Sequence, residues 1–249
     1  MIVFENVYKA FGSKRVLQGF SLEVREGEAM VIIGYSGSGK SVAIKHIVGL
    51  LTPDAGTVLV DDHDVPRLSR RDLSELRASI GYVFQFAALF DSMNIGDNVA
   101  MGLRKRGNMT ERQIADRVAE VLELVDLPNV HEKFPAELSG GMRKRVGLAR
   151  AIALRPKYIL YDEPTTGLDP VTSSVIDDLM VRMRDRLGVT SIVITHDMKS
   201  AFRVGTRIAM LYEGRVRQVG TVDEIRNSRD EEVRQFVEGR AEPNVAAGV

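Results

Sequence analysis

Short runs of apolar residues recur along the chain and predict buried strands. In several of them nearly every position is apolar, as in parallel strands that are covered on both faces. In the second half of the chain, segments long enough for parallel crossovers separate one run from the next. The pattern predicts an α/β fold with helices on both faces of a sheet. The runs lie at residues 29–33, 57–60, 80–84, 158–161, 191–195 and 208–212.

Between residues 86 and 156 a helical pattern replaces the strand pattern. Thr110 and Gln113 have the spacing of a capping box, ahead of apolar residues that repeat every three or four positions. A second helix is expected over residues 139–154, because its apolar positions share one face and Pro156 can end it. We interpret this stretch as an inserted helical lobe.

A further helix is expected to begin at Pro170 and to end before Gly188. Asp169 supplies an N-cap, proline suits the first helical position, and glycine suits the position just past the end. We interpret this helix as scaffold. The tail, residues 238–249, is rich in alanine, glycine and proline and is expected to be frayed.

The run at residues 29–33 leads into a glycine-rich segment that ends in a lysine and a serine. Backbone N–H groups of such a loop can converge on the β- and γ-phosphates of a nucleoside triphosphate, and the lysine adds a full positive charge. The serine hydroxyl would ligate Mg²⁺. An ordinary strand-to-helix turn that needs glycines is the alternative. The segment is Gly34-Tyr35-Ser36-Gly37-Ser38-Gly39-Lys40-Ser41, which fits the pattern G-x-x-x-x-G-K-[ST].

Two carboxylates, Asp162 and Glu163, follow the run at residues 158–161. Ligands of open α/β sheets bind outside the carboxyl ends of the strands, so both side chains are expected near the phosphates. Asp162 is suited to hold Mg²⁺ through its water shell. Glu163 could accept a proton from the water that attacks the γ-phosphate, or orient that water, a role worth roughly 10²- to 10⁴-fold in rate. Taken alone, the pair could instead be a solvated strand end.

His196 and Gln85 also follow predicted strands. His196 is expected at the same sheet edge near the γ-phosphate, although a lone histidine is usually a packed or surface side chain. The Gln85 amide could reach Mg²⁺ or the attacking water, and taken alone this signal is weak. The other histidines have no comparable context and no predicted role: His46, His63 and His131.

Composition narrows the class of protein. The chain has 249 residues, and its 34 basic residues balance 34 acidic ones, so no overall field draws it to nucleic acid or to an anionic bilayer. It contains no cysteine, which excludes disulfides and thiolate metal sites. No apolar run approaches the roughly 18 residues that span a bilayer. We expect a soluble, cytoplasmic chain that would act at a membrane through another polypeptide.

The segment Leu138-Ser139-Gly140-Gly141-Met142 resembles the signature sequence of the ATP-binding-cassette (ABC) ATPases, and the other motifs occur in the order of that family. The resemblance covers nearly the whole chain and implies one ATPase domain. Its P-loop α/β core, with a mostly parallel sheet and an N-terminal antiparallel β region, would comprise residues 1–85 and 157–220. The inserted helical signature subdomain would comprise residues 86–156, and a C-terminal helix and tail residues 221–249.

The resemblance also implies ATP and Mg²⁺ as cofactors, ATP hydrolysis as the reaction, and a role for each motif. The implied nucleotide contacts are Phe11 on adenine, the phosphate loop Gly34 to Ser41 with Val42 directly after it, the signature residues Ser139, Gly140 and Gly141, and Asp169. The implied metal ligands are Ser41, Gln85 and Asp162, and the implied catalytic residues are Glu163, His196 and Gln85.

The signature segment begins a predicted helix and therefore provides a second anion site on the chain. Because the first such helix terminus already holds the phosphates, a second copy must supply the complement. The resemblance implies a head-to-tail dimer in which the signature of one copy closes on the ATP of the other. The basic residues Arg143-Lys144-Arg145 that follow are interpreted as a solvated helix face, with a contribution to positive potential at this site as the alternative.

Several details are similar to the lipid-transport branch of the family. Met142 stands where many members carry glutamine, Val42 follows the phosphate loop, and residues 84–92 and 233–239 are also alike. This likeness implies a phospholipid or related hydrophobic substrate that the complex handles. It also implies an integral membrane permease, a second copy of the chain, and a substrate-binding protein of mammalian-cell-entry type. The implied location is peripheral, on the cytoplasmic face of the inner membrane.

Residues 86–101 are expected to form the groove that grips a cytoplasmic helix of the permease. Phe86, Leu89 and Phe90 fit that docking surface or a buried core equally well. The alternative function is a non-transport cassette that acts as an ATP-driven switch on nucleic acid or on a membrane or cell-division partner. A nucleic-acid partner is not expected, because the sequence has no basic stripe and no long coiled-coil insertion. A regulatory nucleotide binder without turnover is disfavoured because Glu163 is present.

Overall fold

The structure is a computed structural model that describes residues 1–240. Within the described residues the chain divides into two compact units, one formed by residues 1–73 and 192–240 and the other by residues 74–191. Helix α2 (Arg70–Ala78) and strand β8 (Thr190–Ile194) each begin in one unit and end in the other. Most of the tail predicted to be frayed, residues 241–249, lies outside the described residues.

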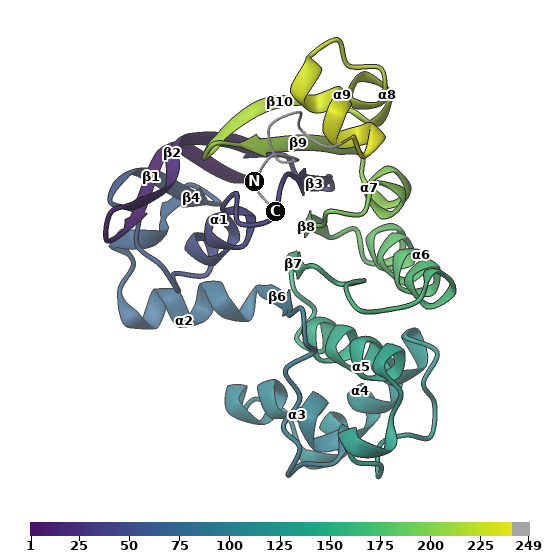
Figure 1. Ribbon diagram of the computed structural model, residues 1–249. Coiled ribbons are helices and arrows are strands. Elements are labelled where there is room, and N and C mark those ends of the chain that lie inside the picture. The colour runs from purple at the N-terminus through teal and green to yellow at the C-terminus, as the bar shows by residue number, and fades with distance from the viewer. Residues whose placement is uncertain (241–249) are drawn as a thin grey trace. The chain divides into compact units, whose positions relative to one another are not determined.

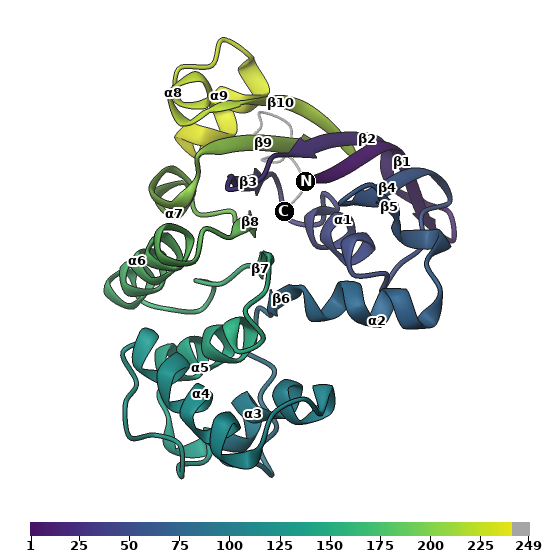
Figure 2. The same cartoon turned by 180° about the vertical axis from the view of Figure 1, so that it is seen from behind.

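The first unit begins with an antiparallel sheet whose strand order is β2-β1-β4-β5 (Figures 1 and 2). Phe4 and Phe20 face each other across the first hairpin and pack edge to face, with ring centroids 5.0 Å apart. A tight turn through Gly12 joins the two hairpin strands. The strands are β1 (Ile2–Phe11), β2 (Lys14–Val24), β4 (Ala55–Val60) and β5 (His63–Asp64).

Parallel pairing in the first unit joins β3 (Ala29–Ile33) to β9 (Arg207–Tyr212). Strand β9 also pairs antiparallel with β10 (Arg215–Thr221). Every residue of β3 is buried, which explains its continuous apolar sequence. Just after β8, Thr195 donates its backbone N–H to the Ile32 carbonyl, so the end of β8 runs beside β3. The helices of this unit are α1 (Lys40–Ile47), η1 (Val65–Arg67), α7 (Met198–Val204), α8 (Val222–Arg226) and α9 (Glu231–Glu238).

The second unit combines two parallel strands with a group of helices (Figure 2). Strand β6 (Ile80–Val83) pairs in register with β7 (Tyr158–Asp162). Thr190, at the start of β8, donates its backbone N–H to the Lys157 carbonyl next to β7. The helices are α3 (Ile95–Arg106), α4 (Glu111–Leu124), η2 (Pro135–Glu137), α5 (Gly140–Ile152) and α6 (Pro170–Leu187).

The helix boundaries predicted from capping signals are confirmed. The capping box of Thr110 and Gln113 starts α4, and Asp169 caps α6, which ends at Gly188 in a left-handed conformation. Helix α5 starts after Ser139, as expected, but stops at Ile152, short of the predicted end. The Arg117 guanidinium donates to the carbonyls of Ile152 and Ala153 and so caps this end.

Four strands were not predicted from apolar runs: β1, β2, β10 and the two-residue β5. Register shifts interrupt the pairing of β1 with β2 at several points, and one interrupts the pairing of β10 with β9. Each such bulge adds a residue to one strand, so the side chains beyond it point to the opposite face of the sheet from the one that strict alternation predicts. The alternation of apolar and polar positions is therefore broken within β1, β2 and β10, although the strands themselves are continuous.

Helix α1 buries His46, which is 1% exposed. Its Nδ1 lies 2.7 Å from the Val42 carbonyl oxygen, and its Nε2 has no hydrogen-bond partner within residues 1–240. Burial lowers the pKa of His46 below its usual value of 6.5, and the nearby Lys9 ammonium lowers it further, against the opposing effect of the Val42 carbonyl. His46 therefore stays neutral in the folded chain at a pH where it is charged in the unfolded chain.

We expect the free energy of unfolding to decrease as the pH falls below about 6.5, because the unfolded chain then binds a proton at His46 that the folded chain does not. The decrease from this one group is at most about 1.4 kcal/mol per pH unit. Urea unfolding at pH 7.5 and pH 5.5 would measure it. His46→Asn, which can keep the bond to Val42, should flatten the pH dependence, whereas the control His131→Asn should not. Equal pH dependence in the wild type and His46→Asn would contradict the assignment.

Candidate nucleotide site

The phosphate loop, residues 34–41, connects β3 to α1 in the first unit. Gly34 lies pressed against β9, so that a Cβ atom there would meet the Leu211 carbonyl oxygen at 2.3 Å. Gly39 is the N-cap of α1 in a left-handed conformation, and a Cβ atom there would meet Val16 at 2.9 Å. Only glycine fits these two positions, which explains why the pattern requires it at both ends of the loop.

The N-terminus of α1 differs from those of the other helices around the predicted motifs. Side-chain oxygens cap α3, α4, α5, α6 and α7, whereas in the described part of the chain no side chain caps α1. Backbone N–H groups at an uncapped helix start, together with the positive end of the helix dipole, favour an anion. The loop therefore offers the donors that a phosphate group accepts.

Two side chains of the loop also fit a phosphate ligand. The Lys40 side chain is held at 6% exposure, and its ammonium donates to the carbonyl oxygens of Gly34 at 2.7 Å and Tyr35 at 3.0 Å. The Ser38 hydroxyl is buried and has no hydrogen-bond partner among residues 1–240. A buried cation and an unsatisfied buried hydroxyl both gain from an added anion. These residues fit the triphosphate of ATP.

His196 and Phe11 both lie in the first unit and are exposed. His196 follows Thr195, whose backbone is bonded to β3, the strand that leads into the phosphate loop. Phe11 lies at the end of the first hairpin, and the Lys9 ammonium lies 5.7 Å from the centroid of its ring. An exposed aromatic ring at a strand end can stack on a base.

In the second unit, Asp162 ends β7 and is largely buried. The Tyr82 hydroxyl donates to its Oδ2 atom at 3.1 Å, which fixes the orientation of the carboxylate. Burial, together with the Asp162 charge, raises the pKa of Tyr82, so the phenol remains a donor. The Tyr82 ring in turn stacks on Phe84, with centroids 4.3 Å apart.

Glu163 has a left-handed backbone conformation, with φ of 51°, which is uncommon for a residue with a side chain. Residues held in such conformations concentrate at functional sites, because the surrounding structure must stabilise them. Here the Thr166 hydroxyl donates to Glu163 Oε2 at 3.0 Å, and the Thr166 backbone N–H donates to the Glu163 carbonyl. Both ends of the Glu163 residue, its carboxylate and its carbonyl, are thus held by Thr166.

Lys144 corrects the interpretation of residues 143–145 as a solvated helix face. Its side chain is only 8% exposed. The ammonium donates to the Gln85 carbonyl at 2.5 Å and to the Glu163 carbonyl at 3.4 Å. Burial lowers the pKa of Lys144, and the Glu163 charge opposes this effect. Lys144 therefore connects the signature helix to two predicted catalytic residues, a role that a run of three basic residues did not reveal.

The signature residues lie at the start of α5, close to the start of α6. The Ser139 hydroxyl accepts the Met142 backbone N–H and caps α5. A Cβ atom on Gly141 would meet the Thr172 side chain of α6 at 2.4 Å, so this glycine allows the two helix starts to approach. Thr172 donates to Asp169 through its backbone and its hydroxyl, and Asp169 is thereby fixed as the cap of α6.

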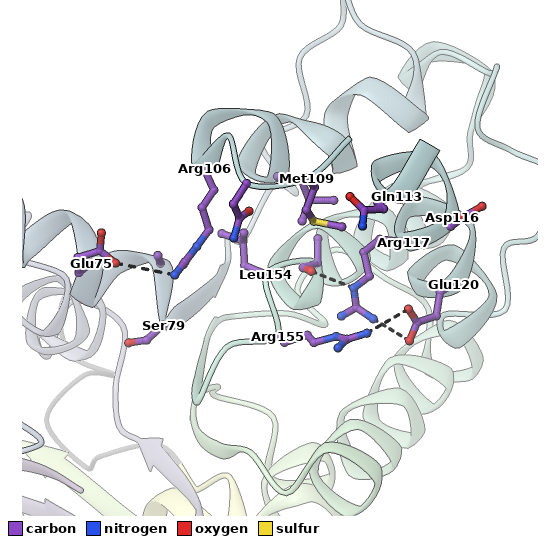
Figure 3. Close-up of a pocket in the computed structure, with 14 residues that line it drawn as sticks. Glu75, Ser79, Arg106, Met109, Gln113, Asp116, Arg117, Glu120, Leu154 and Arg155 are labelled. Atoms are coloured by element: carbon purple, nitrogen blue, oxygen red, sulfur yellow. Dashed lines mark hydrogen bonds and ion pairs between the residues drawn. The ribbon is translucent and has the colours of Figure 1, made fainter. Parts of the chain in front are cut away.

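A cavity of about 670 Å³ in the second unit involves other residues (Figure 3). Its lining comes from the end of α2, from α3 and α4, and from the segment after α5, and includes none of the predicted nucleotide contacts. Arg117 is buried and pairs with Glu120 at 2.7 Å, while Arg106 pairs with Glu75 at 3.9 Å. Basic and acidic side chains of the lining thus pair with one another.

Sequence comparisons match the chain to the ABC transporter family over residues 17–166. Over 239 residues it is 41% identical to the "Probable ribonucleotide transport ATP-binding protein mkl" of Mycobacterium leprae, an alignment that covers 96% of this chain and 69% of that protein. It spans 65% of the protein of the same name in Mycobacterium bovis. It is also 41% identical over 256 residues to "Protein TRIGALACTOSYLDIACYLGLYCEROL 3, chloroplastic" of Arabidopsis thaliana, covering 96% of this chain and 74% of that one.

A solved structure described as a dimeric post-hydrolysis state of the ATP-binding cassette MJ0796 bound to ADP and Pi is also similar. Its TM-score is 0.82 at 34% identity, over 89% of this chain and 99% of that chain. Fold and phosphate loop thus define an ATP-binding cassette with ATPase activity. The chain belongs to the ABC transporter family.

We expect Lys144→Met, which keeps the aliphatic stem and removes the ammonium, to lower kcat for ATP hydrolysis about 10- to 100-fold through misplacement of Gln85 and Glu163. The KM for ATP should change little, because the phosphate loop is untouched. Steady-state ATPase kinetics would measure both constants, with exposed Arg112→Met as the control. Lys144→Arg should restore part of the activity. An unchanged kcat in folded Lys144→Met would exclude the positioning role.

Proposed function

We propose that this chain is the ATPase subunit of an ABC transporter that moves a phospholipid or a related hydrophobic substrate. The main observation in support of ATP binding is the phosphate loop. It combines the uncapped start of α1, the buried Lys40 side chain and the unsatisfied Ser38 hydroxyl. We treat the whole chain as one ATPase domain, with a core in residues 1–85 and 157–220, a helical subdomain in residues 86–156 and a C-terminal element from residue 221.

In this proposal, backbone N–H groups and Lys40 bind the phosphates of ATP, and Phe11 stacks on the adenine. Ser41, Gln85 and Asp162 are the proposed ligands of Mg²⁺, which would neutralise phosphate charge when bound. Glu163 orients the attacking water and accepts its proton, and His196 donates a hydrogen bond towards the γ-phosphate. The Tyr82 bond to Asp162 supports this assignment, because it fixes the orientation of the carboxylate.

A head-to-tail dimer would complete the chemistry. Ser139 and Gly140 are exposed at the start of α5, so this helix terminus is accessible to a phosphate held by a second copy. The MJ0796 structure is described as dimeric and bound to ADP and Pi, which supports a nucleotide-bound dimer here. In the proposed cycle, binding of two ATP molecules joins the copies, and hydrolysis releases them.

The proposed docking surface for the permease lies after Gln85 in the second unit. Phe86 is 84% exposed and Phe90 is 48% exposed, which favours a docking role for these two rings over the buried-core interpretation. Met101 on α3 is also exposed. No helix among residues 1–240 is long and apolar enough to cross a bilayer.

The lipid substrate is supported by the likeness to the lipid-transport branch and by the name of the Arabidopsis relative. The same likeness is the basis for proposing an integral membrane permease and a mammalian-cell-entry type binding protein as partners. The Arabidopsis relative is named for trigalactosyldiacylglycerol, which is a lipid, whereas the mycobacterial relative is named for ribonucleotides. Location at the cytoplasmic face of the inner membrane follows from the proposed permease. A cassette that switches a membrane or cell-division partner is the alternative that the experiment below distinguishes.

Replacing Glu163 by glutamine should remove the proton acceptor but keep the nucleotide contacts. We expect kcat for ATP hydrolysis to fall roughly 10²- to 10⁴-fold, and the variant to accumulate as an ATP-bound dimer. Phosphate release and light scattering with and without ATP would measure the two effects. Glu137→Gln, an exposed acid ahead of the signature, is the matched control. Hydrolysis at the parent rate would show that another group is the base.

Affinity purification of the chain from its native membranes in mild detergent tests the transporter assignment. We expect a multi-spanning permease, a mammalian-cell-entry type protein and phospholipid to copurify, as identified by mass spectrometry. Phe86→Asp should lose the permease without loss of ATP binding, because it places a charge on the proposed docking surface. Recovery of a division protein or nucleic acid in place of a permease would instead support the switch.

A further inference from the structure

The C-terminal helix α9 contacts the phosphate loop through aromatic side chains. The rings of Phe236 and Tyr35 pack edge to face, with centroids 5.1 Å apart and planes at 86°. Tyr212, at the end of β9, meets the same Tyr35 ring at 6.2 Å. Tyr35 thus lies between a strand end and a helix that is far away in the sequence. Such aromatic pairs stabilise beyond the burial of their area.

Tyr35 is the large side chain in a loop made otherwise of glycine, serine and lysine. Its carbonyl oxygen accepts hydrogen bonds from the Lys40 ammonium and from the Ser38 backbone N–H, at 3.0 and 3.2 Å. The glycines give the loop wide conformational freedom, which costs entropy to restrict. A ring fixed from outside the loop is therefore an effective way to hold the backbone that carries the phosphate contacts.

Helix α9 is itself firmly anchored to the first unit. Val233 is fully buried, and the Asp230 carboxylate caps the helix by accepting two backbone N–H groups. Arg217 of β10 pairs with Asp230 at 2.8 Å, and the Ser228 hydroxyl donates to Gln218 of the same strand. Because β10 pairs with β9, one continuous set of contacts leads from α9 to the strand end beside Tyr35. Phe236 is therefore presented from a fixed support.

We propose that Phe236 is a positioning residue for ATP: it holds Tyr35, and through Tyr35 it keeps the phosphate loop in the conformation that receives phosphate. The proposal rests on the proposed role of that loop. Without the Phe236 ring, part of the binding energy of ATP would be spent on ordering the loop. The loss should appear in affinity rather than in turnover of the bound nucleotide, since none of the proposed catalytic groups touches Phe236.

The test compares phenylalanine substitutions in the full-length chain. Phe236→Ala should raise the Kd for a fluorescent ATP analogue, and the KM for ATP, by about 3- to 10-fold, the range expected for one aromatic pair. The kcat of Phe236→Ala at saturating ATP should stay within about twofold of the parent value. Phe236→Tyr should keep the parent affinity. The matched control is Phe202→Ala on α7, another half-buried phenylalanine of this unit, which instead packs on the Arg226 guanidinium.

A double-mutant cycle with Tyr35→Ala tests whether Phe236 acts through Tyr35. The effects of the two substitutions on Kd should not add, because either one alone breaks the contact. Additive effects, or an equal rise in Kd for Phe202→Ala, would overturn the proposal. Should Phe236→Ala fail to fold, Phe236→Leu, which keeps bulk without the ring edge, takes its place with the same expected direction.

Lys40→Ala separates failure of this inference from failure of the phosphate site. If Lys40→Ala abolishes binding while Phe236→Ala leaves the Kd unchanged, the site stands and the positioning role is excluded. If Lys40→Ala leaves the parent affinity unchanged, the phosphate loop is not the ATP site and both proposals fall. Thermal unfolding of each variant, measured without nucleotide, completes the comparison, since a purely structural role would lower the unfolding midpoint without changing the Kd of the folded fraction.

Discussion

The phosphate loop depends on the buried ammonium of Lys40. Removing a charge from water is costly unless other charges or hydrogen bonds replace the water. Here the carbonyls of Gly34 and Tyr35 receive the ammonium, and these carbonyls can turn towards it because the loop is rich in glycine. The loop thus combines a buried cation with the uncapped start of a helix, whose dipole adds positive potential at the same place.

In the second unit, Lys144 takes a comparable position among backbone carbonyls. It joins the segment after β6, the turn after β7 and the signature helix α5, so one side chain fixes the distance between Gln85 and Glu163. The left-handed backbone conformation of Glu163 is energetically unfavourable for a residue with a side chain. It therefore requires stabilising contacts of this kind from the surrounding structure. Buried lysines thus organise the backbone of both halves of the predicted chemistry, at Lys40 by holding the loop closed and at Lys144 by holding two segments together.

Local signals in the sequence predicted the parts of the fold that depend on neighbouring residues. Capping by Thr110 and Asp169 and the continuous apolar strands β3 and β7 are such parts, because their causes lie within a few positions. The motif pattern likewise predicted a glycine-rich loop between a strand and a helix, and residues 34–39 connect β3 to α1. The burial of Lys144 and the contact of Tyr35 with Phe236 depend on segments distant in the sequence, and neither charge nor periodicity reports such contacts. Strands β1 and β2 were missed for a different reason, since their bulges disturb the alternation itself.

The caps of α5 and α6 differ chemically, and this difference separates two otherwise similar motifs. Asp169 is an acceptor, and its oxygens already receive two backbone N–H groups and the Thr172 hydroxyl. A carboxylate so occupied fixes the start of α6. Ser139 uses one lone pair to accept the Met142 N–H, and its O–H can still donate. The signature helix can therefore keep its cap while it offers a hydroxyl and backbone donors to an anion. The same serine can thus stabilise the helix of a single copy and donate a hydrogen bond to a phosphate presented by a second copy. It does not have to give up the bond that it accepts from the Met142 N–H.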